Sequence, residues 1–376
     1  MYIIDLKDDF MKIITVLGAR PQFIKAALVS NELRKNNEEI IIHTGQHYNI
    51  ELSEIFFKEM GIPQPDYNLE VGSGSHAAQT AKMMIKLEEK FQEESPDMVL
   101  LYGDTNSTLA AAITASKLNL PIAHVEAGPR MYDKSVPEEV NRIITDHIST
   151  LLFAPTPYAA ENLYKEGLKD AVHLTGDVML DLFQFFSKKA DESSSILEEL
   201  GLDRGEYILT TIHRARNTDS IENLKAITHA FDDLSANYKI VFPVHPRTVK
   251  YLNEYGLYDA LQENPNIQLI KPVGYLDMNI LTRNACRIVT DSGGLQKEAF
   301  FARVPCITID SSTGWPETVL EGWNTIFTES KNNFLDKDEI INVVDVFNPK
   351  GQYENVFGNG QASKKICKIL ESYGEN

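Results

Sequence analysis

The chain contains 376 residues, of which 43% are hydrophobic and 24% are charged, and its formal net charge is −18. This length predicts two domains, and the composition is ordinary for a globular protein. The negative charge argues against non-specific binding to nucleic acid or to an anionic membrane surface. The three cysteines, Cys286, Cys306 and Cys367, have no metal-ligand spacing and are expected to be reduced thiols.

Several functional classes lack their sequence signals in this chain. The N-terminal residues have neither the basic nor the apolar stretch of a signal peptide, and no segment has the ~20 apolar residues needed to cross a bilayer. Zinc-ligand spacing, a Walker A loop and a nucleophile elbow are also missing. We therefore expect a cytoplasmic protein that binds no metal, membrane or nucleic acid.

In the first half of the chain, short apolar segments alternate with helical patterns. Strands are expected at 12–17, 40–44, 98–102 and 121–125, and helices at 23–35, 51–60, 76–93 and 107–117. This alternation with short turns predicts a parallel, doubly wound sheet. Polar residues follow the strands directly, at the sheet edge where open α/β folds bind ligands.

The same pattern restarts after a serine-rich acidic stretch at 191–195. Strands are expected at 207–211, 239–244, 267–270, 287–290 and 305–309, with the last of these closing the series, and the final helix is expected at 362–373. We therefore predict two α/β domains of Rossmann type, at 1–185 and 186–360.

The turn after the first strand could bind an anion. Gly18 precedes a helix, and Arg20 and Lys25 add positive charge near the start of that helix. A plain strand–helix turn with solvated cations explains the same spacing equally well. The motif lacks the G-x-G-x-x-G pattern, so a dinucleotide fingerprint is absent.

Carboxylates follow two more strands of the first half. Asp104 could be a general base, although a helix N-cap is the commoner role for such a residue. Glu126 follows an apolar strand and is hard to explain as a surface residue. Glu138 and Arg142 are four residues apart, so they could form an ordinary surface pair. Together these side chains suit acid–base chemistry at a carbon atom.

The second half offers basic and glycine-rich turns. His213 and Arg214 suit a pyrophosphate, or form a solvated basic turn, and His245 is equally compatible with a structural role. The segment Ser292-Gly293-Gly294 presents backbone N–H groups at a helix start, which favours phosphate binding. Glu298 could accept both ribose hydroxyls, or it could be a surface residue of that helix.

In combination, these segments resemble the non-hydrolysing UDP-N-acetylglucosamine 2-epimerases from about Met11 to the C-terminus. The resemblance implies a GT-B-like fold with two Rossmann-like domains facing a cleft, a last helix (361–376) that packs on the N-terminal domain, and a homodimer without metal or nicotinamide. The matching motifs are Gly18-Ala19-Arg20-Pro21 with Lys25, Thr44-Gly45-Gln46-His47, Gly103-Asp104-Thr105, His124-Val125-Glu126-Ala127-Gly128, Pro137-Glu138-Glu139 with Asn141-Arg142, His213-Arg214, Pro243-Val244-His245, and Thr290-Asp291-Ser292-Gly293-Gly294 with Glu298.

The reaction implied by the resemblance is elimination of UDP to give a 2-acetamidoglucal, followed by re-addition of UDP with C2 inverted. The implied catalytic residues are Asp104, Glu126, Glu138 and His213. A GT-B glycosyltransferase and a nucleotide-sugar sensor without activity are the alternatives. The residues implied to bind the UDP-sugar are Arg20, Lys25, Arg130, Arg142, Arg214, His245, Tyr275, Ser292, Gly293, Gly294 and Glu298.

Some positions depart from the commoner family pattern. Trp315 stands where members acting on UDP-N-acetylglucosamine commonly have Arg, Met278 where an aromatic ring is common, and Arg216 where Glu is common. These departures resemble the branch that epimerises UDP-2,3-diacetamido-glucuronic acid. The sequence leaves the substrate open between these two UDP-sugars.

Overall fold

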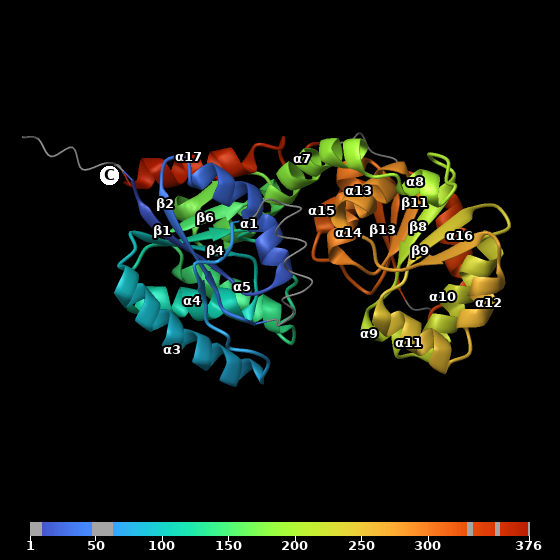
Figure 1. Ribbon diagram of the computed structural model, residues 1–376, viewed down its shortest axis with the longest axis horizontal. Coiled ribbons are helices and arrows are strands. Elements are labelled where there is room, and N and C mark those ends of the chain that lie inside the picture. Colours follow the sequence, from blue (N-terminus) through green and yellow to red (C-terminus); the bar gives the residue numbers. More distant parts are fainter. Residues whose placement is uncertain (1–9, 47–62, 329–333, 350–353, 375–376) are drawn as a thin grey trace, which may run out of the picture. The chain divides into compact units, whose positions relative to one another are not determined.

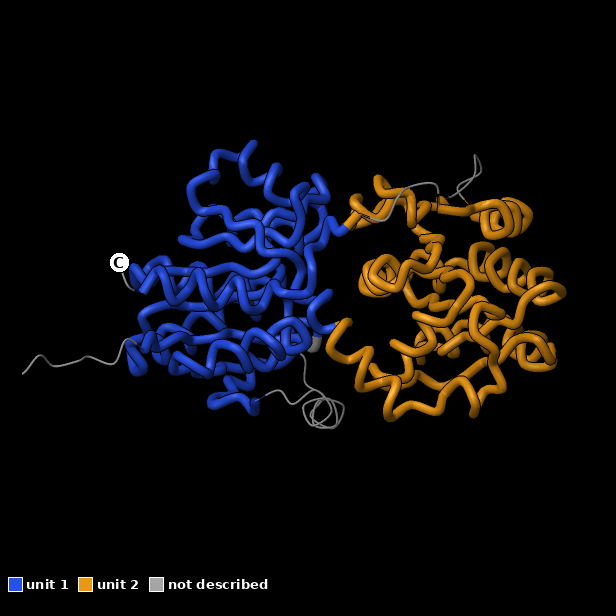
Figure 2. The backbone as a smooth tube through the Cα atoms, turned by 90° about the horizontal axis from the view of Figure 1, so that it is seen from above, with its two compact units in different colours: residues 1–182, 355–376 blue, residues 183–354 orange. Residues whose placement is uncertain are grey.

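The computed structural model describes residues 10–46, 63–328, 334–349 and 354–374 (Figure 1). The helix expected at 51–60 and the motif residue His47 lie outside these ranges. The chain divides into two compact units, Met1–Leu182 with Asn355–Asn376 (unit 1) and Phe183–Glu354 (unit 2), drawn in blue and orange in Figure 2. The described helices include none that is long and apolar enough to cross a membrane.

Unit 1 contains a seven-stranded parallel sheet in the order β3-β2-β1-β4-β5-β6-β7. Helices α3, α4 and α5 pack together along one face, and α17 packs beside α1 (Figure 1). The elements are β1 Lys12–Leu17, α1 Arg20–Leu33, β2 Glu38–His43, β3 Tyr67–Asn68, α3 His76–Glu94, β4 Met98–Tyr102, α4 Asn106–Lys117, β5 Ile122–Val125, α5 Pro137–Ile148, β6 Leu151–Ala154, α6 Pro157–Lys165, β7 Val172–Leu174, α7 Val178–Ser193, which continues into unit 2, and α17 Ala362–Gly374.

Unit 2 contains a six-stranded parallel sheet in the order β10-β9-β8-β11-β12-β13. Its helices α10 and α16 pack against each other, as do α13 and α14. The elements are α8 Ile196–Glu199, β8 Tyr207–Thr211, α9 Ala215–Thr218, α10 Ile221–Leu234, β9 Lys239–Pro243, α11 Pro246–Glu254, α12 Tyr258–Glu263, β10 Ile267–Ile270, α13 Tyr275–Asn284, β11 Arg287–Thr290, α14 Gly293–Ala302, β12 Cys306–Ile309, α15 Pro316–Leu320, β13 Asn324–Phe327 and α16 Lys337–Val346.

The central strands carry the apolar runs from which they were predicted. In β1, five of the six residues are buried, and all five residues of β4 are buried, as expected for strands covered on both faces. The expectation that 305–309 closes the series is wrong, because β13 pairs with β12 at the sheet edge. Polar Asn324 and Thr325 begin β13, so no continuous apolar run marks this edge strand.

Candidate active site

Asp104 and Glu126 lie just beyond the carboxyl ends of the neighbouring strands β4 and β5. Glu126 has φ 67°, a left-handed conformation that is rare for a residue with a side chain and costs ~1–3 kcal/mol. Its turn is fixed because the N–H of Ala127 donates to the carbonyl of Phe153 at 3.1 Å. A strained residue held in this way is typical of functional sites.

Lys25, on α1, forms an ion pair with Glu126. Its Nζ lies 2.6 Å from Oε1 of Glu126, and the two side chains are 14% and 8% exposed. Gly103, with φ 61°, makes room for the ammonium group, because a Cβ at this position would lie 3.2 Å from Nζ of Lys25. The structure therefore brings Lys25, Glu126 and the backbone preceding Asp104 together at one sheet edge.

Asp104 is held by two residues of α5. The Arg142 guanidinium donates to its carboxylate, and the amide of Asn141 donates to its main-chain carbonyl at 2.9 Å. The capping role belongs instead to Thr105, whose hydroxyl accepts the N–H of Thr108. The interpretation of Asp104 as the N-cap of α4 is therefore wrong.

Arg142 does not form the simple surface pair with Glu138. Its guanidinium donates to Glu139 at 2.6 Å as well as to Asp104, whereas Glu138 lies exposed in the first turn of α5. Glu139 is fully buried and also accepts the N–H groups of Met131 and Tyr132. Sequence reasoning gave Glu139 no role, since spacing alone allows Arg142 either partner.

The β1–α1 turn offers less to an anion than its sequence predicts. The side-chain oxygen of Gln22 already accepts the N–H groups of Gly18 and Ala19, at 2.8 and 3.1 Å. A Cβ on Gly18 would lie 1.9 Å from Oγ of Ser107, so glycine is required here by packing against α4. Arg20 is the first residue of α1.

Arg130 belongs to the core of unit 1. Its side chain has no exposed surface, and it pairs with Asp146 and Glu166, both at 2.7 Å. The two carboxylates balance its charge, as a buried guanidinium requires. We therefore leave Arg130 out of the substrate contacts that we propose.

In unit 2, His213 is anchored by the buried Asp291. Nδ1 of His213 lies 3.0 Å from the carboxylate, so a ligand would meet the other ring nitrogen, Nε2. Asp291 also accepts the main-chain N–H groups of His213 and Arg214 and the amide of Asn217. Burial alone would raise the pKa of Asp291, but these hydrogen bonds and the His213 ring lower it below its usual value.

The start of α14 has the composition of an anion site. Ser292 is the N-cap, and its hydroxyl forms no capping hydrogen bond. Arg214 is held by Asp310 at 2.6 Å, and its guanidinium and the Trp315 indole nitrogen each lie 3.9 Å from where a Cβ on Gly293 would stand. Helix N-terminal N–H groups, a guanidinium and an indole N–H all favour a negatively charged ligand.

Glu298 lies inside α14 and is buried, so the surface-residue interpretation is wrong. Burial raises its pKa to about 7, against the opposing effects of the Lys297 ammonium and the Tyr275 hydroxyl. Tyr275, at the start of α13, also has its pKa raised well above the usual value, chiefly by burial and then by Glu298. Glu298 and Tyr275 therefore form a mostly buried polar pair near the Ser292–Gly294 turn.

His245 combines a structural contact with a place near His213. Its Nδ1 accepts the N–H of Arg247 at 3.1 Å and so caps α11. The two histidine rings are 5.7 Å apart. Burial and then the neighbouring cationic groups of His213 and Arg247 lower the pKa of His245, which favours its neutral form.

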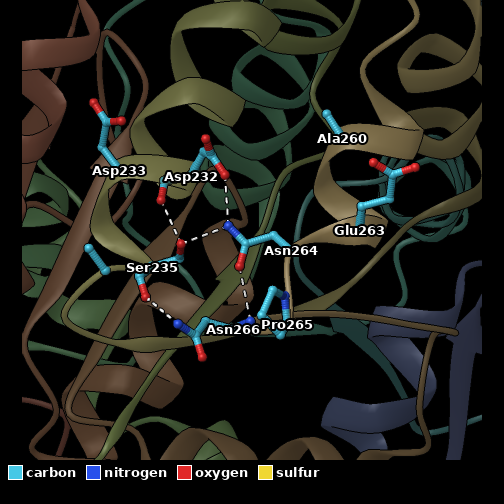
Figure 3. Close-up of a pocket in the computed structure, with 9 residues that line it drawn as sticks. Asp232, Asp233, Ser235, Ala260, Glu263, Asn264, Pro265 and Asn266 are labelled. Atoms are coloured by element: carbon cyan, nitrogen blue, oxygen red, sulfur yellow. Dashed lines mark hydrogen bonds between the residues drawn. The ribbon is translucent and has the colours of Figure 1, made fainter.

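A hollow in unit 2 lies at the opposite edge of the sheet, where strands begin (Figure 3). Three of its side chains contact one another, because the Asn264 amide donates to Asp232 at 2.7 Å and to Ser235 at 2.8 Å. Asn266 donates to the Ser235 carbonyl. These contacts fix the turn before β10, and the hollow shares no residue with the site described above.

Among the described residues, no group of three or more His, Cys, Asp or Glu side chains is placed to hold a metal ion.

The two α/β units, each with a parallel sheet and polar side chains after its strands, have the fold of the GT-B-like class. The family model for UDP-N-acetylglucosamine 2-epimerase matches residues 31–371. The chain therefore belongs to the UDP-N-acetylglucosamine 2-epimerase family.

Individual relatives agree with this assignment over nearly the whole chain. A UDP-N-acetylglucosamine 2-epimerase homolog of Methanococcus maripaludis is 51% identical, covering 96% of this chain and 100% of that protein. The UDP-2,3-diacetamido-2,3-dideoxy-D-glucuronate 2-epimerase of Pseudomonas aeruginosa is 42% identical, with coverages of 96% and 99%. The crystal structure of Methanocaldococcus jannaschii UDP-GlcNAc 2-epimerase with UDP-GlcNAc and UDP is 42% identical, with a TM-score of 0.84 and coverages of 96% and 100%.

These similarities confirm the family and the fold class predicted from the sequence. The enzyme is an isomerase of the non-hydrolysing epimerase type, so the glycosyltransferase alternative loses its support.

Proposed function

We propose that this enzyme inverts C2 of a UDP-linked 2-acetamido sugar, with Asp104, Glu126 and Glu138 as its acid–base groups. The observation that carries the proposal is the pair of carboxylates at adjacent strand ends, each held by its own cation. Asp104 is bonded by Arg142, and Glu126 is bonded by Lys25. An inversion needs proton removal on one face of the sugar and proton return on the other, which two fixed groups can divide between them.

The proposed reaction proceeds in two balanced steps. A carboxylate takes the C2 proton, the C2–H electron pair forms a C1–C2 double bond, and the C1–O bond breaks with its electrons going to UDP. UDP oxygen then attacks C1 again, and the double-bond electrons take a proton at C2 from the opposite face. No redox partner is required, because the substrate and the product are isomers.

Unit 2 supplies the leaving-group site in this proposal. Charge develops on the UDP phosphates as the C1–O bond breaks, and preorganised donors lower the energy of that charge. Arg214, Nε2 of His213 and the N–H groups of Ser292–Gly294 are the proposed donors, and Asp310 and Asp291 hold the first two in place. The buried Glu298 is the proposed ribose contact.

Two sugars are candidates for the substrate, UDP-N-acetylglucosamine and UDP-2,3-diacetamido-2,3-dideoxy-glucuronic acid. Relatives named for each are 42% identical to this chain. To decide, the purified enzyme is incubated with each sugar in deuterated water and followed by proton NMR. We expect loss of the C2 proton signal and growth of a manno-configured product with one of them. If neither sugar exchanges its C2 proton, the proposal is wrong.

We further propose that the enzyme is a cytoplasmic homodimer that uses the apolar face of unit 1. A groove between α3, α4 and α5 is lined mainly by apolar atoms, including Met84, Leu109 and Val140. Ile85 is 62% exposed on α3. Light scattering coupled to gel filtration should give twice the chain mass, and Ile85→Glu with Val140→Glu should give monomers. A monomeric wild-type protein would contradict the proposal.

A further inference from the structure

His124, on β5, lies fully buried between two polar partners in unit 1. Its Nδ1 is 2.7 Å from the Asp146 carboxylate, and its Nε2 is 2.8 Å from the carbonyl oxygen of Gly103. A carbonyl oxygen only accepts hydrogen bonds, so Nε2 must carry a hydrogen.

The other ring nitrogen, Nδ1, faces the carboxylate of Asp146, which two further donors hold in place. The Arg130 guanidinium lies 2.7 Å from this carboxylate, and the N–H of Gly128 donates to it at 3.2 Å. Both ring nitrogens of His124 therefore face hydrogen-bond acceptors.

The charged groups around this network lie within unit 1. Arg130 pairs with Asp146 and Glu166, and Nε2 of the half-exposed His147 lies 3.2 Å from Glu166. Beside Gly103, a Cβ on the glycine would lie 3.2 Å from Nζ of Lys25 and 3.8 Å from Oε1 of Glu126. Buried charges are retained only with such compensation.

This network joins the two turns that carry Asp104 and Glu126. Through Nε2, His124 holds the carbonyl of Gly103, the residue directly before Asp104. Through Asp146, it reaches the N–H of Gly128, two residues after Glu126. The other side of the first turn is fixed by Gln22, whose amide donates to the Tyr102 carbonyl at 2.8 Å.

We propose that His124 is a positioning residue that sets the Gly103–Asp104 turn against the Glu126–Gly128 turn through Asp146. The proposal rests on the proposed roles of Asp104 and Glu126 in the epimerase reaction. His124 itself has no exposed surface and does not touch the substrate. Its effect is on the relative placement of the two acid–base groups, which a rate measurement detects.

Two substitutions separate the two ends of the ring. His124→Gln places an amide donor near Nε2, toward Gly103, and His124→Asn places one near Nδ1, toward Asp146. We expect His124→Asn to lose ~10²-fold in kcat, His124→Gln to lose roughly 10-fold or less, and KM for the UDP-sugar to change little in both. His173→Asn, on β7 of the same unit, is the matched control and should retain wild-type kcat. Equal losses in the Gln and Asn variants, or a loss confined to KM, would overturn the proposal.

Discussion

Nζ of Lys25 lies 2.6 Å from Oε1 of Glu126, and the pair links helix α1 to the turn after β5. Both side chains are mostly buried, and Glu126 has the positive φ that side-chain-bearing residues rarely adopt. A buried ion pair and a strained backbone each lower stability relative to ordinary packing. Glu126 combines both features. Such a combination is expected at a residue whose backbone and side chain are arranged for catalysis at a cost in stability.

Lys25→Met tests this relationship. It leaves the Glu126 carboxylate buried without its lysine partner, and breaking a buried pair costs about 3–5 kcal/mol. We expect the free energy of unfolding to fall by this order, and kcat for C2 inversion to fall by at least ~10²-fold because the carboxylate loses the contact that fixes its position. Denaturant unfolding and NMR-monitored exchange at C2 measure the two effects.

Lys35→Met is the control for that substitution. Lys35 pairs with Glu32 on the surface, with side chains 59% and 27% exposed, and such pairs contribute ~0–1 kcal/mol. Similar losses from the two lysine variants would show that the burial of the Lys25–Glu126 pair has no special effect.

Asp291→Asn removes the carboxylate that holds His213. The neutral amide keeps the shape but cannot accept Nδ1–H and two backbone N–H groups with the same strength. We expect kcat to fall by at least ~10²-fold, with the loss greater in kcat than in KM. Asp219→Asn, which breaks an exposed pair with Arg247 in the same unit, should leave kcat within about 2-fold.

The stabilising effect of Asp291 should depend on pH with a defined sign. Its pKa is lowered in the folded protein, so its contribution is present above the ordinary aspartate pKa of ~3.9 and is lost as the pH falls through the lowered value. The difference in unfolding free energy between wild type and Asp291→Asn should therefore be largest near neutral pH and shrink in acid. A difference that grows on acidification would contradict this assignment.

The central strands and the site positions could be predicted because they follow from local patterns. Continuous apolar runs mark buried parallel strands, and polar residues directly after them reach the binding edge. The partners could not be predicted. Asp146 lies 22 residues beyond His124, and only the packing of α5 brings the two side chains together. For Arg142, spacing allowed both Glu138 and Glu139, and the direction of α5 selects the buried Glu139.

Trp315→Arg tests whether the residue before Pro316 contributes to sugar choice. The Lys297 ammonium lies 3.7 Å from the centre of the Trp315 ring, and such a contact contributes ~0.5–2 kcal/mol. Arginine at 315 replaces that attraction by repulsion between cations, so we expect a lower melting temperature. Adding Lys297→Met should recover stability, because it removes the repelling ammonium without placing a second carboxylate beside Glu298. If the double variant is no more stable than Trp315→Arg, the cation–ring contact is not the cause. The ratio of rates on the two UDP-sugars, measured in the wild type and in both variants, shows whether the sugar preference changes with residue 315.

Glu298→Gln should change stability and nucleotide binding in opposite directions. The folded protein holds the pKa of Glu298 at about 7, above its ordinary value of 4.5, because the side chain is buried in α14. A raised pKa means that stability is fully present below the ordinary value and is lost as the pH rises from 4.5 through 7. The neutral glutamine escapes this loss, which amounts to about 3 kcal/mol on the basis of ~1.4 kcal/mol per pKa unit. We therefore expect Glu298→Gln to match wild type near pH 5 and to exceed it in unfolding free energy near pH 8, whereas the exposed Glu263→Gln shows neither effect.

UDP binding by calorimetry should weaken by about 10-fold or more in Glu298→Gln, because a carboxylate accepts ribose hydroxyls more strongly than an amide does. Unchanged UDP affinity would show that Glu298 does not contact the nucleotide. An equal gain in unfolding free energy at both pH values would show that the gain does not come from the ionisation of Glu298.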